Sequence, residues 1–369
     1  MDRRTFLKRA TTLAGGGALA ASSMAMPAVA QTMPAVRWRL ASDYPQELKI
    51  IYEGALLLAK LVAEATDNQF QIEVSPTGAV VPTLGLLDAL KAKTVEMGQT
   101  ASYNYFTVDP TFAFGTAVPF GLNARMQNAW MYEAGGLDLL NAFYADHGIT
   151  ALLGGNTGAQ MGGWFRDPVT SVDDFNGLSF RIGGFAGRVF ARLGAKPQAL
   201  PVAKILDAFR DGSVDAAELV GPFDDENFQL NSVARHYYSP GWWEGGAMLM
   251  FWVGLDAWKE LPPVYRSVLA TSAAAVNVRM LAQYDIANPA ALRRLIASGT
   301  ELHAFPEDVT DACLAAANDV YAEISAENAV FKTIYGSMTE YRDAALQWFP
   351  LADGAYDDYM ASAERRGEL

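Results

Sequence analysis

Two stretches of the sequence repeat one short pattern, 119 residues apart. The stretch 87–97 reads LDALKAKTVEM, and the stretch 206–216 reads LDAFRDGSVDA. Each predicts the end of a helix, a tight turn and a short strand, and each follows a strand candidate, at 70–75 and at 196–200. A chance match of a common local unit is one explanation. The other, which we favour, is a fold of two similar α/β lobes with a ligand cleft between them.

The start of the body predicts the order of elements in the first lobe. Val36, Trp38 and Leu40 alternate with arginines, which indicates a strand. A helix is predicted after Pro45, with these apolar residues on one face: Ile51, Ala55, Leu58, Val62 and Ala65. A second alternating stretch at 70–74 indicates another strand. Strand, helix and strand at this spacing make a right-handed parallel unit, which is typical of an α/β fold.

The N-terminus carries the pattern of an export signal. Residues 3–8 read RRTFLK, a glycine- and alanine-rich apolar stretch follows, and residues 28–30 read AVA. This pattern predicts a twin-arginine signal peptide over residues 1–30, cleaved after Ala30. A basic N-terminal tail is the alternative interpretation. The signal predicts that the remaining 339 residues act in the periplasm.

Charge and composition exclude several classes of partner and activity. The formal net charge is −13, and without the four basic residues and one acidic residue of the predicted signal it is −16. Such an acidic chain argues against nucleic acid or an anionic membrane surface as partner. The single cysteine, Cys313, lies in an apolar run that indicates a buried residue. The three histidines, at 147, 236 and 303, lack the spacing of a metalloprotease or catalytic triad, so little indicates an enzyme.

Arg181 is the strongest candidate for binding an anion. It stands near the end of a predicted strand, 178–182, before the glycine-rich turn GGFAG at 183–187. Glycines let the backbone approach a ligand, and the free amides of the helix predicted to follow favour an anion. The guanidinium is suited to two-pronged binding of a carboxylate. A dinucleotide site and an ordinary surface arginine are the alternatives.

Two glutamates stand in apolar or glycine-rich sequence. Glu218 follows the second repeat, and Glu244 lies in GWWEGG at 241–246. A buried carboxylate needs a cation or a donor, which Arg181 or a hard metal ion such as sodium or calcium would supply. A pair of catalytic carboxylates is the enzymatic alternative. The neighbouring acidic run 224–226 is predicted to be a solvated turn or helix start.

Uncharged polar and aromatic side chains complete the set of candidates. Asn156 and Gln160 offer amide groups in the glycine-rich segment 154–164, where capping of a structural turn is the alternative role. Tyr103 belongs to the aromatic run YNYF at 103–106, which lines either a ligand cleft or the core.

Five motifs, in this order along the chain, carry a family resemblance. They are AVPFGL at 117–122, NTGAQMGGW at 156–164, RIGGFAG at 181–187, ELVGP at 218–222 and YSPGWWEGG at 238–246. Together they resemble the DctP-type extracytoplasmic solute-binding subunits of TRAP transporters, most closely the members that bind α-keto acids, or lactate as a metal salt. The resemblance covers essentially the whole mature chain. It implies an α/β, two-lobe periplasmic binding protein that closes on a small carboxylate.

The resemblance also implies boundaries. Lobe 1 is expected at about 31–153 plus part of the C-terminal half, lobe 2 at about 154–250, and a helical C-terminal region at 261–369. The helix-like stretch 330–369 has an apolar stripe that packs either on its own lobe or on a second subunit. Because some keto-acid binders exchange a long C-terminal helix, the resemblance raises the option of a homodimer through this region.

Site residues follow from the same resemblance. It implies substrate contacts from five side chains: Arg181, Gln160, Tyr103, Asn156 and Glu218. It implies that Glu218, the backbone carbonyl of Leu219 and Glu244 hold a sodium or calcium ion that bridges to the substrate carboxylate. Arg181 would pair with that carboxylate directly.

Two positions depart from the subgroup's usual pattern and leave the ligand open. Leu219 stands where the subgroup usually has tryptophan, and Leu206 stands where tyrosine is common. Leucine is smaller and less polar than the usual aromatic residues in this pocket wall. This predicts a 2-oxo or 2-hydroxy monocarboxylate whose side chain is larger or more apolar than that of pyruvate. The resemblance implies a binding protein, not an enzyme, that delivers this ligand to the TRAP membrane permease. A periplasmic enzyme acting on a 2-oxo acid and a ligand-presenting sensor subunit are the alternatives.

Overall fold

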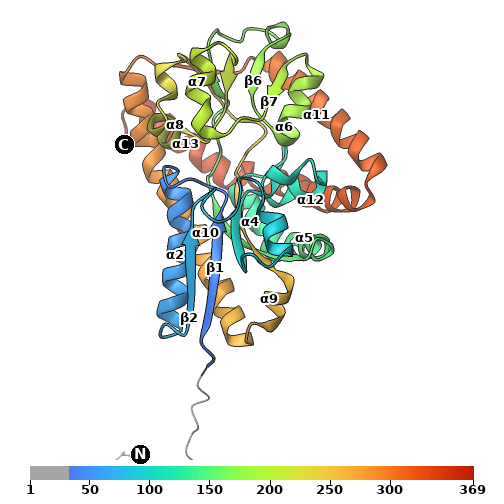
Figure 1. The fold of residues 1–369 in the computed structure, drawn as a ribbon. Helices are drawn as coiled ribbons and strands as arrows, with labels where there is room; N and C mark the ends of the chain where they lie inside the picture. The colour runs from blue at the N-terminus through green and yellow to red at the C-terminus, as the bar shows by residue number, and fades with distance from the viewer. Residues whose placement is uncertain (1–32) are drawn as a thin grey trace, which may run out of the picture. The chain divides into compact units, whose positions relative to one another are not determined.

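The strands of the protein form two separate sheets in the computed structural model, which describes residues 33–369. The predicted signal peptide lies outside the described residues. None of the helices in this part of the chain is long and apolar enough to cross a membrane. The two sheets, each with its own helices, confirm the prediction of a two-lobe α/β fold (Figure 1).

The first sheet has five strands in the order β2-β1-β3-β10-β4. Their bounds are β1 (Val36–Ser42), β2 (Phe70–Ser75), β3 (Met97–Thr100), β4 (Ile149–Asn156) and β10 (Met248–Gly254). β1 pairs in parallel with β2 and β3, and α2 (Lys49–Ala65) connects β1 to β2, as the strand–helix–strand pattern predicted. The helix begins at Lys49 and not at Pro45, because a turn whose Leu48 amide donates to the Pro45 carbonyl comes first.

The second sheet has six strands in the order β11-β9-β5-β8-β6-β7. Their bounds are β5 (Gly163–Phe165), β6 (Ser179–Arg181), β7 (Lys196–Gln198), β8 (Ala216–Ala217), β9 (His236–Ser239) and β11 (Glu301–Ala304). β6 pairs in parallel with β7 and β8. β11 joins this sheet from the region 261–369, which was expected to be helical. After β9 the chain leaves this sheet and enters the first as β10.

The repeated sequence pattern has the structure that it predicted. α3 (Leu86–Lys91) leads through a turn into β3, and α7 (Ile205–Arg210) leads through a turn into β8. The corresponding turn residues, Lys93 and Gly212, both have positive φ, 59° and 77°. One local unit therefore precedes a strand in each sheet, and each of those strands ends beside candidate site residues.

The remaining helices cover the sheets and link the two lobes. They are α4 (Ala124–Glu133), α5 (Gly136–Asp146), α6 (Gly184–Arg192), α8 (Pro222–Asn227), α9 (Leu255–Glu260), α10 (Pro263–Ala297), α11 (Glu307–Glu327), α12 (Ala329–Trp348) and α13 (Ala355–Arg365). α10, 35 residues long, packs on α2 and β4 of the first lobe and on α8 of the second. Figure 1 shows α2 beside β1 and β2, with β6, β7 and α7 at the opposite end.

The C-terminal helices pack mostly on the protein's own core. Within the predicted stripe of α12, Met338 and Ala345 are buried, and Tyr335 stacks on Tyr321 of α11. Trp348, at the end of the same helix, is 61% exposed. Cys313 on α11 is fully buried, as its apolar surroundings predicted. The stripe of α12 therefore packs mainly on the protein's own core, while Trp348 and the later residues Leu351, Tyr356 and Tyr359 are exposed.

Candidate functional site

The candidate residues gather where strands of both sheets end. Arg181 ends β6, and Glu218 follows β8, the parallel neighbour in which Ala217 lies opposite Arg181. From the first sheet, Tyr103 follows β3 in a short 3₁₀ helix (Ser102–Tyr105), and Asn156 ends β4. The carboxyl ends of parallel strands are the usual place of ligand sites in open α/β sheets, because successive loops meet there.

A glycine-rich bend ties together the two segments that carry glutamates. The Gln160 amide donates to the Glu244 carbonyl at 3.0 Å, and the Gln160 carbonyl accepts from the Gly241 amide at 2.9 Å. On the other side, the Met161 amide donates to the Val220 carbonyl at 3.3 Å. The bend therefore lies between the segment that contains Glu244 and the one that contains Glu218.

This close packing depends on glycine at two positions. A Cβ atom on Gly241 would lie 2.7 Å from the Met161 carbonyl oxygen. Gly163 has φ +91°, and a Cβ atom there would lie 2.8 Å from the Ala217 carbonyl oxygen. Larger residues would push the three segments apart, so the glycines of this motif let the glutamate-bearing segments approach.

Arg181 and Glu218 form an ion pair. Arg181 Nη1 lies 2.6 Å from Glu218 Oε1 and also donates to the Glu218 carbonyl oxygen at 2.6 Å. Its Nε donates to the Leu200 carbonyl, just beyond β7, at 3.1 Å. These contacts fix the orientation of the guanidinium plane. Its remaining nitrogen, Nη2, makes no hydrogen bond to any residue between 33 and 369, so the structure leaves one prong of the fork open.

Glu244 is the least compensated charge of the site. Its side chain is 4% exposed, and the nearby Tyr103 is the neighbour that does most to lower its pKa. Its Oε2 atom is buried and has no hydrogen-bond partner in the described part of the chain. A buried carboxylate oxygen without a partner is costly, since its lost hydration is not replaced. Among residues 33–369, the carbonyl oxygen of the buried Leu219 likewise receives no hydrogen bond.

Burial dominates the protonation of the two glutamates. It raises the pKa of Glu218 to about 7; Arg181 works against this rise and Asp225 adds to it. Burial and the charge of Glu218 raise the pKa of Glu244 well above its usual value, although Tyr103 and Arg181 oppose the rise. One guanidinium is therefore not enough to stabilise both carboxylates in their ionised form. An additional positive charge would stabilise them.

Tyr44 is a further member of the cluster that sequence reasoning missed. It follows β1, so it lies at the same edge of the first sheet as Tyr103. Its pKa is raised well above the usual value by burial, and the charges of Asp43 and Glu244 add to this. The signal that could have found it is its position: it comes directly after a predicted strand, as Tyr103 does.

The two amide candidates have mainly structural contacts. Gln160 Nε2 donates to the Thr157 hydroxyl at 3.1 Å. Asn156 is fully buried; its Oδ1 accepts from the Gly158 amide, and its Nδ2 donates to Gln127 Oε1. The structure thus brings Arg181, Glu218, Glu244 and Tyr103 together. It places Gln160 beside them through its backbone, while the Asn156 side chain caps the bend.

The acidic run at 224–226 corrects one expectation. It does start a helix, α8, as predicted, but Asp224 and Asp225 are buried and not solvated. Asp225 Oδ2 accepts from Trp164 Nε1 and from the Tyr237 hydroxyl, while Asp224 accepts from the Tyr284 hydroxyl. The donors come from β5, β9 and α10, which are remote in sequence, so local composition could not reveal them.

The site combines one guanidinium that has an open nitrogen with two buried glutamates. Hard cations such as sodium and calcium prefer oxygen ligands. Three groups here carry such oxygens: Glu244 Oε2, the Leu219 carbonyl and the Glu218 carboxylate. The open Nη2 of Arg181 is suited to a carboxylate. No pair of histidine and acid, and no nucleophile, accompanies these groups among the site residues described above.

Residues 41–328 match the model of the bacterial extracellular solute-binding protein family 7, also called DctP. Among curated proteins, the chain is 40% identical to a monocarboxylate 2-oxoacid-binding periplasmic protein of Nostoc sp. strain PCC 7120. The alignment spans 99% of this chain and the whole of that protein.

Solved structures of TRAP solute-binding proteins are similar along the same length. One from Bordetella bronchiseptica RB50, a mixed-occupancy dimer with copurified calcium and picolinate in one site, is 41% identical with a TM-score of 0.88, over 90% of this chain and 99% of that one. One from Colwellia psychrerythraea with bound calcium and pyruvate is 34% identical with a TM-score of 0.86, over 88% and 99%.

A third structure, from Pseudoalteromonas atlantica T6c with bound sodium and pyruvate, is 34% identical with a TM-score of 0.85, over 88% of this chain and 98% of that one. The family match covers most of the chain, and these relatives align with it nearly end to end. The chain belongs to the bacterial extracellular solute-binding protein family 7 and is a periplasmic solute-binding protein of the TRAP transporter type.

Proposed function

We propose that this protein binds a small 2-oxo or 2-hydroxy monocarboxylate together with a sodium or calcium ion. The observation that carries the proposal is the buried, unpartnered Oε2 of Glu244, in a cluster with a second carboxylate and a single arginine. A cation bound there would compensate the excess negative charge and would let an anionic ligand enter. The cation thus explains why two buried glutamates and a carboxylate ligand share one site.

Each site residue has a role in this proposal. Glu218, the Leu219 carbonyl and Glu244 hold the cation, and Arg181 binds the ligand carboxylate through Nη2. Tyr103 keeps the Glu244 carboxylate oriented and adds a polar contact. Gln160 contributes a further polar contact from its place beside Glu244, and Asn156 supports the bend. The calcium, sodium, pyruvate and picolinate of the similar structures support this ligand class.

This chain differs from the usual pattern of its subgroup at two positions that we expect to contact the side chain of the ligand. Leu219 is buried beside Glu218, and Leu206 stands on α7. Both are aliphatic where aromatic residues are usual, so the pocket wall is smaller and less polar. We therefore propose a ligand whose side chain is larger or more apolar than the methyl group of pyruvate.

The remaining steps of transport belong to the same proposal. Residues 1–30 direct export by the twin-arginine route. Lobe 1, at about 31–153 with part of the C-terminal half, and lobe 2, at about 154–250, close on the ligand, and the closed form delivers it to the TRAP membrane permease. A homodimer through the C-terminal helices is a further option, which the dimer of the Bordetella bronchiseptica protein supports.

Calorimetric titration with a panel of monocarboxylates tests the ligand class. The panel holds pyruvate, longer aliphatic 2-oxo acids, lactate, picolinate and succinate, each with calcium. We expect binding of the 2-oxo acids, strongest for those with longer side chains, and none of the dicarboxylate. Recovery of the ligand unchanged after long incubation, by mass spectrometry, is expected of a binding protein. Turnover of a 2-oxo acid that is lost in Glu218→Gln would instead favour the enzymatic alternative.

A further inference from the structure

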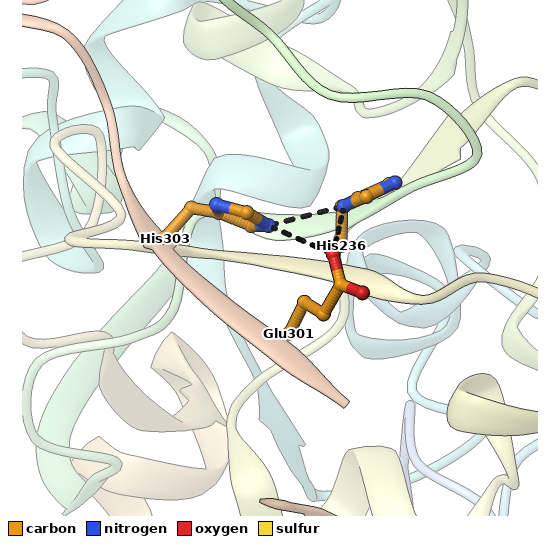
Figure 2. Close-up of side chains that lie close together, drawn as sticks. All are labelled: His236, Glu301 and His303. Atoms are coloured by element: carbon orange, nitrogen blue, oxygen red, sulfur yellow. Dashed lines mark hydrogen bonds and ion pairs between the residues drawn. The ribbon is translucent and has the colours of Figure 1, made fainter. Parts of the chain in front are cut away.

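Two histidines that are 67 residues apart in sequence meet at the edge of the second sheet. β11, the edge strand, pairs in parallel with β9, so His236 lies opposite Glu301 and Tyr238 lies opposite His303. Opposite residues of paired strands share a face, and alternate residues return to it. Figure 2 shows His236, Glu301 and His303 converging from the two strands.

The three nearest ligand atoms form a small triangle. His236 Nδ1 lies 3.0 Å from His303 Nε2 and 3.3 Å from Glu301 Oε2. His303 Nε2 and Glu301 Oε2 lie 3.9 Å apart. A point at equal distance from all three atoms lies about 2.0 Å from each, which is the length of zinc–nitrogen and zinc–oxygen bonds. The atoms thus already stand at coordination distance around one centre.

Two neutral imidazoles and a carboxylate satisfy one another poorly at these distances. With one proton shared between His236 Nδ1 and His303 Nε2, the carboxylate oxygen faces at least one nitrogen lone pair. Each neutral imidazole has one donor and one acceptor nitrogen, and an ionised carboxylate has only acceptors. A cation at the centre, in contrast, uses the lone pairs of all three atoms at once.

We propose that His236 Nδ1, His303 Nε2 and Glu301 Oε2 form a binding site for a divalent transition metal of the zinc class. Two imidazole nitrogens and one carboxylate suit zinc, whereas calcium and sodium prefer oxygen ligands. The side chains of His236 and His303 are 17% and 32% exposed, so solvent reaches the position. A water molecule supplies the fourth ligand when small side-chain shifts let the metal lie out of the plane of the three protein atoms.

Neighbouring side chains hold the ligands in place. Arg235 Nε lies 2.9 Å from Glu301 Oε1, so it fixes the other oxygen of the carboxylate and leaves Oε2 directed at the histidines. The ring of Tyr238 stacks on that of His303 at 5.0 Å. Such supporting contacts orient metal ligands and raise affinity.

The bound metal would clamp β11 to the body of the sheet. Among the strands of residues 33–369, β9 alone pairs with β11, and after β9 the same chain continues to Glu244. The metal would therefore stabilise β11, an edge strand that is hydrogen-bonded to the sheet on one side. The metal position is separate from the ligand site. This inference does not depend on the proposed function.

Zinc titration of untagged protein tests the site. The Glu244→Gln background removes the other acidic candidate for binding a cation. We expect one zinc per chain with micromolar or tighter affinity, no competition by calcium, and a rise in Tm of at least about 2 °C with excess zinc. Cobalt in place of zinc should give the intense visible absorption of a tetrahedral nitrogen-ligated ion.

Three further variants decide the assignment. His303→Asn and His236→Gln should each weaken zinc binding at least about tenfold and abolish the tetrahedral cobalt spectrum. His147→Asn, which changes the histidine outside the cluster, should leave both unchanged. Circular dichroism verifies that each variant is folded. The proposal is overturned by a background protein without stoichiometric zinc binding, or by equal zinc affinity in folded His303→Asn and His236→Gln.

Discussion

Asp225 and Glu244 are two buried carboxylates with opposite surroundings. Asp225, 1% exposed, receives hydrogen bonds at both oxygens: from Trp164 and Tyr237 at Oδ2, and from the Val220 amide at Oδ1. Glu244, 4% exposed, keeps its buried Oε2 without a hydrogen-bond partner among residues 33–369. Burial raises the pKa of both, that of Asp225 to about 6 and that of Glu244 well above its usual value.

The comparison separates a carboxylate whose hydrogen bonds hold the fold together from one that, in our proposal, binds a cation with the ligand. Asp225 ties α8 to β5 and β9, and its donors replace lost hydration, so it contributes to stability. Glu244 is held in place by its backbone, while its side chain lacks the donors that its burial requires. A folded protein that retains such a group does so at a cost in stability, which bound cation and ligand recover.

The largest effect should come from Glu244→Gln. The variant keeps the shape and the Tyr103 contact but removes the charge that the cation needs. We expect the affinity for a 2-oxo acid with calcium to fall about thirtyfold or more, about 2 kcal/mol, while the unliganded variant unfolds at equal or higher denaturant concentration than wild type. Calorimetry and urea unfolding measure the two quantities. Glu53→Gln at an exposed position of α2 is the control. A loss of stability without a loss of affinity in Glu244→Gln would contradict the distinction.

Asp225→Asn should show the reverse pattern. Both oxygens of Asp225 accept hydrogen bonds, but asparagine has an NH₂ group in place of one of them. That group faces a hydrogen-bond donor and cannot accept from it, so buried hydrogen bonds are lost. We expect the free energy of unfolding to fall by about 1–3 kcal/mol. Affinity, measured below the unfolding transition, should change less than about threefold. A fall in affinity as large as that of Glu244→Gln would place Asp225 in the binding machinery.

Arg181→Lys sharpens the assignment of the anion-binding group. Lysine keeps the charge but cannot contact the Leu200 carbonyl, the Glu218 carboxylate and a ligand carboxylate in one plane. We expect at least about tenfold weaker ligand binding, about 1.4 kcal/mol. The control is Arg188→Lys on the exposed side of α6. Unchanged affinity in Arg181→Lys would remove this residue from the site.

A pH series gives the smallest effect. The raised pKa of Asp225 means that the folded state holds its proton up to about pH 6, whereas the unfolded state loses it near pH 4. Stability contributed by this group therefore decreases as pH rises from about 4 to about 6 and is constant above. We expect the advantage of wild type over Asp225→Asn in urea unfolding to shrink across this window. An advantage that grows with pH would mean that Asp225 is stabilised in its ionised form.

Local patterns predicted the elements that alternate or repeat. The strand at 36–40, the strand at 70–75 and the repeated helix–turn–strand units needed only side-chain period and turn residues, so the sequence was sufficient. Arg181, Glu218 and Glu244 became candidates because of their unusual settings, a charged group before glycines and two acids in apolar sequence. Their individual roles were implied by the family resemblance. The structure brings all three together.

Groups defined by distant partners could not be found in this way. Asp224 and Asp225 appeared solvated because their donors, Tyr284 and Tyr237, belong to other elements. His236 and His303 had no motif spacing, since pairing of β9 with β11 brings them together. Tyr44 follows a predicted strand, which was a local signal, but its relation to Glu244 exists only across the fold.

The central claim is that the cation is needed to bind the carboxylate, and titration in a metal-free medium tests it most directly. Protein is stripped of metal by chelation and dialysis, and sodium is replaced by tetramethylammonium. Calorimetry then follows a 2-oxo acid that binds with calcium present. The account predicts at least about tenfold weaker binding without metal, and recovery on addition of calcium or sodium. Full affinity in the metal-free medium would contradict it and would make Glu218 and Glu244 structural residues.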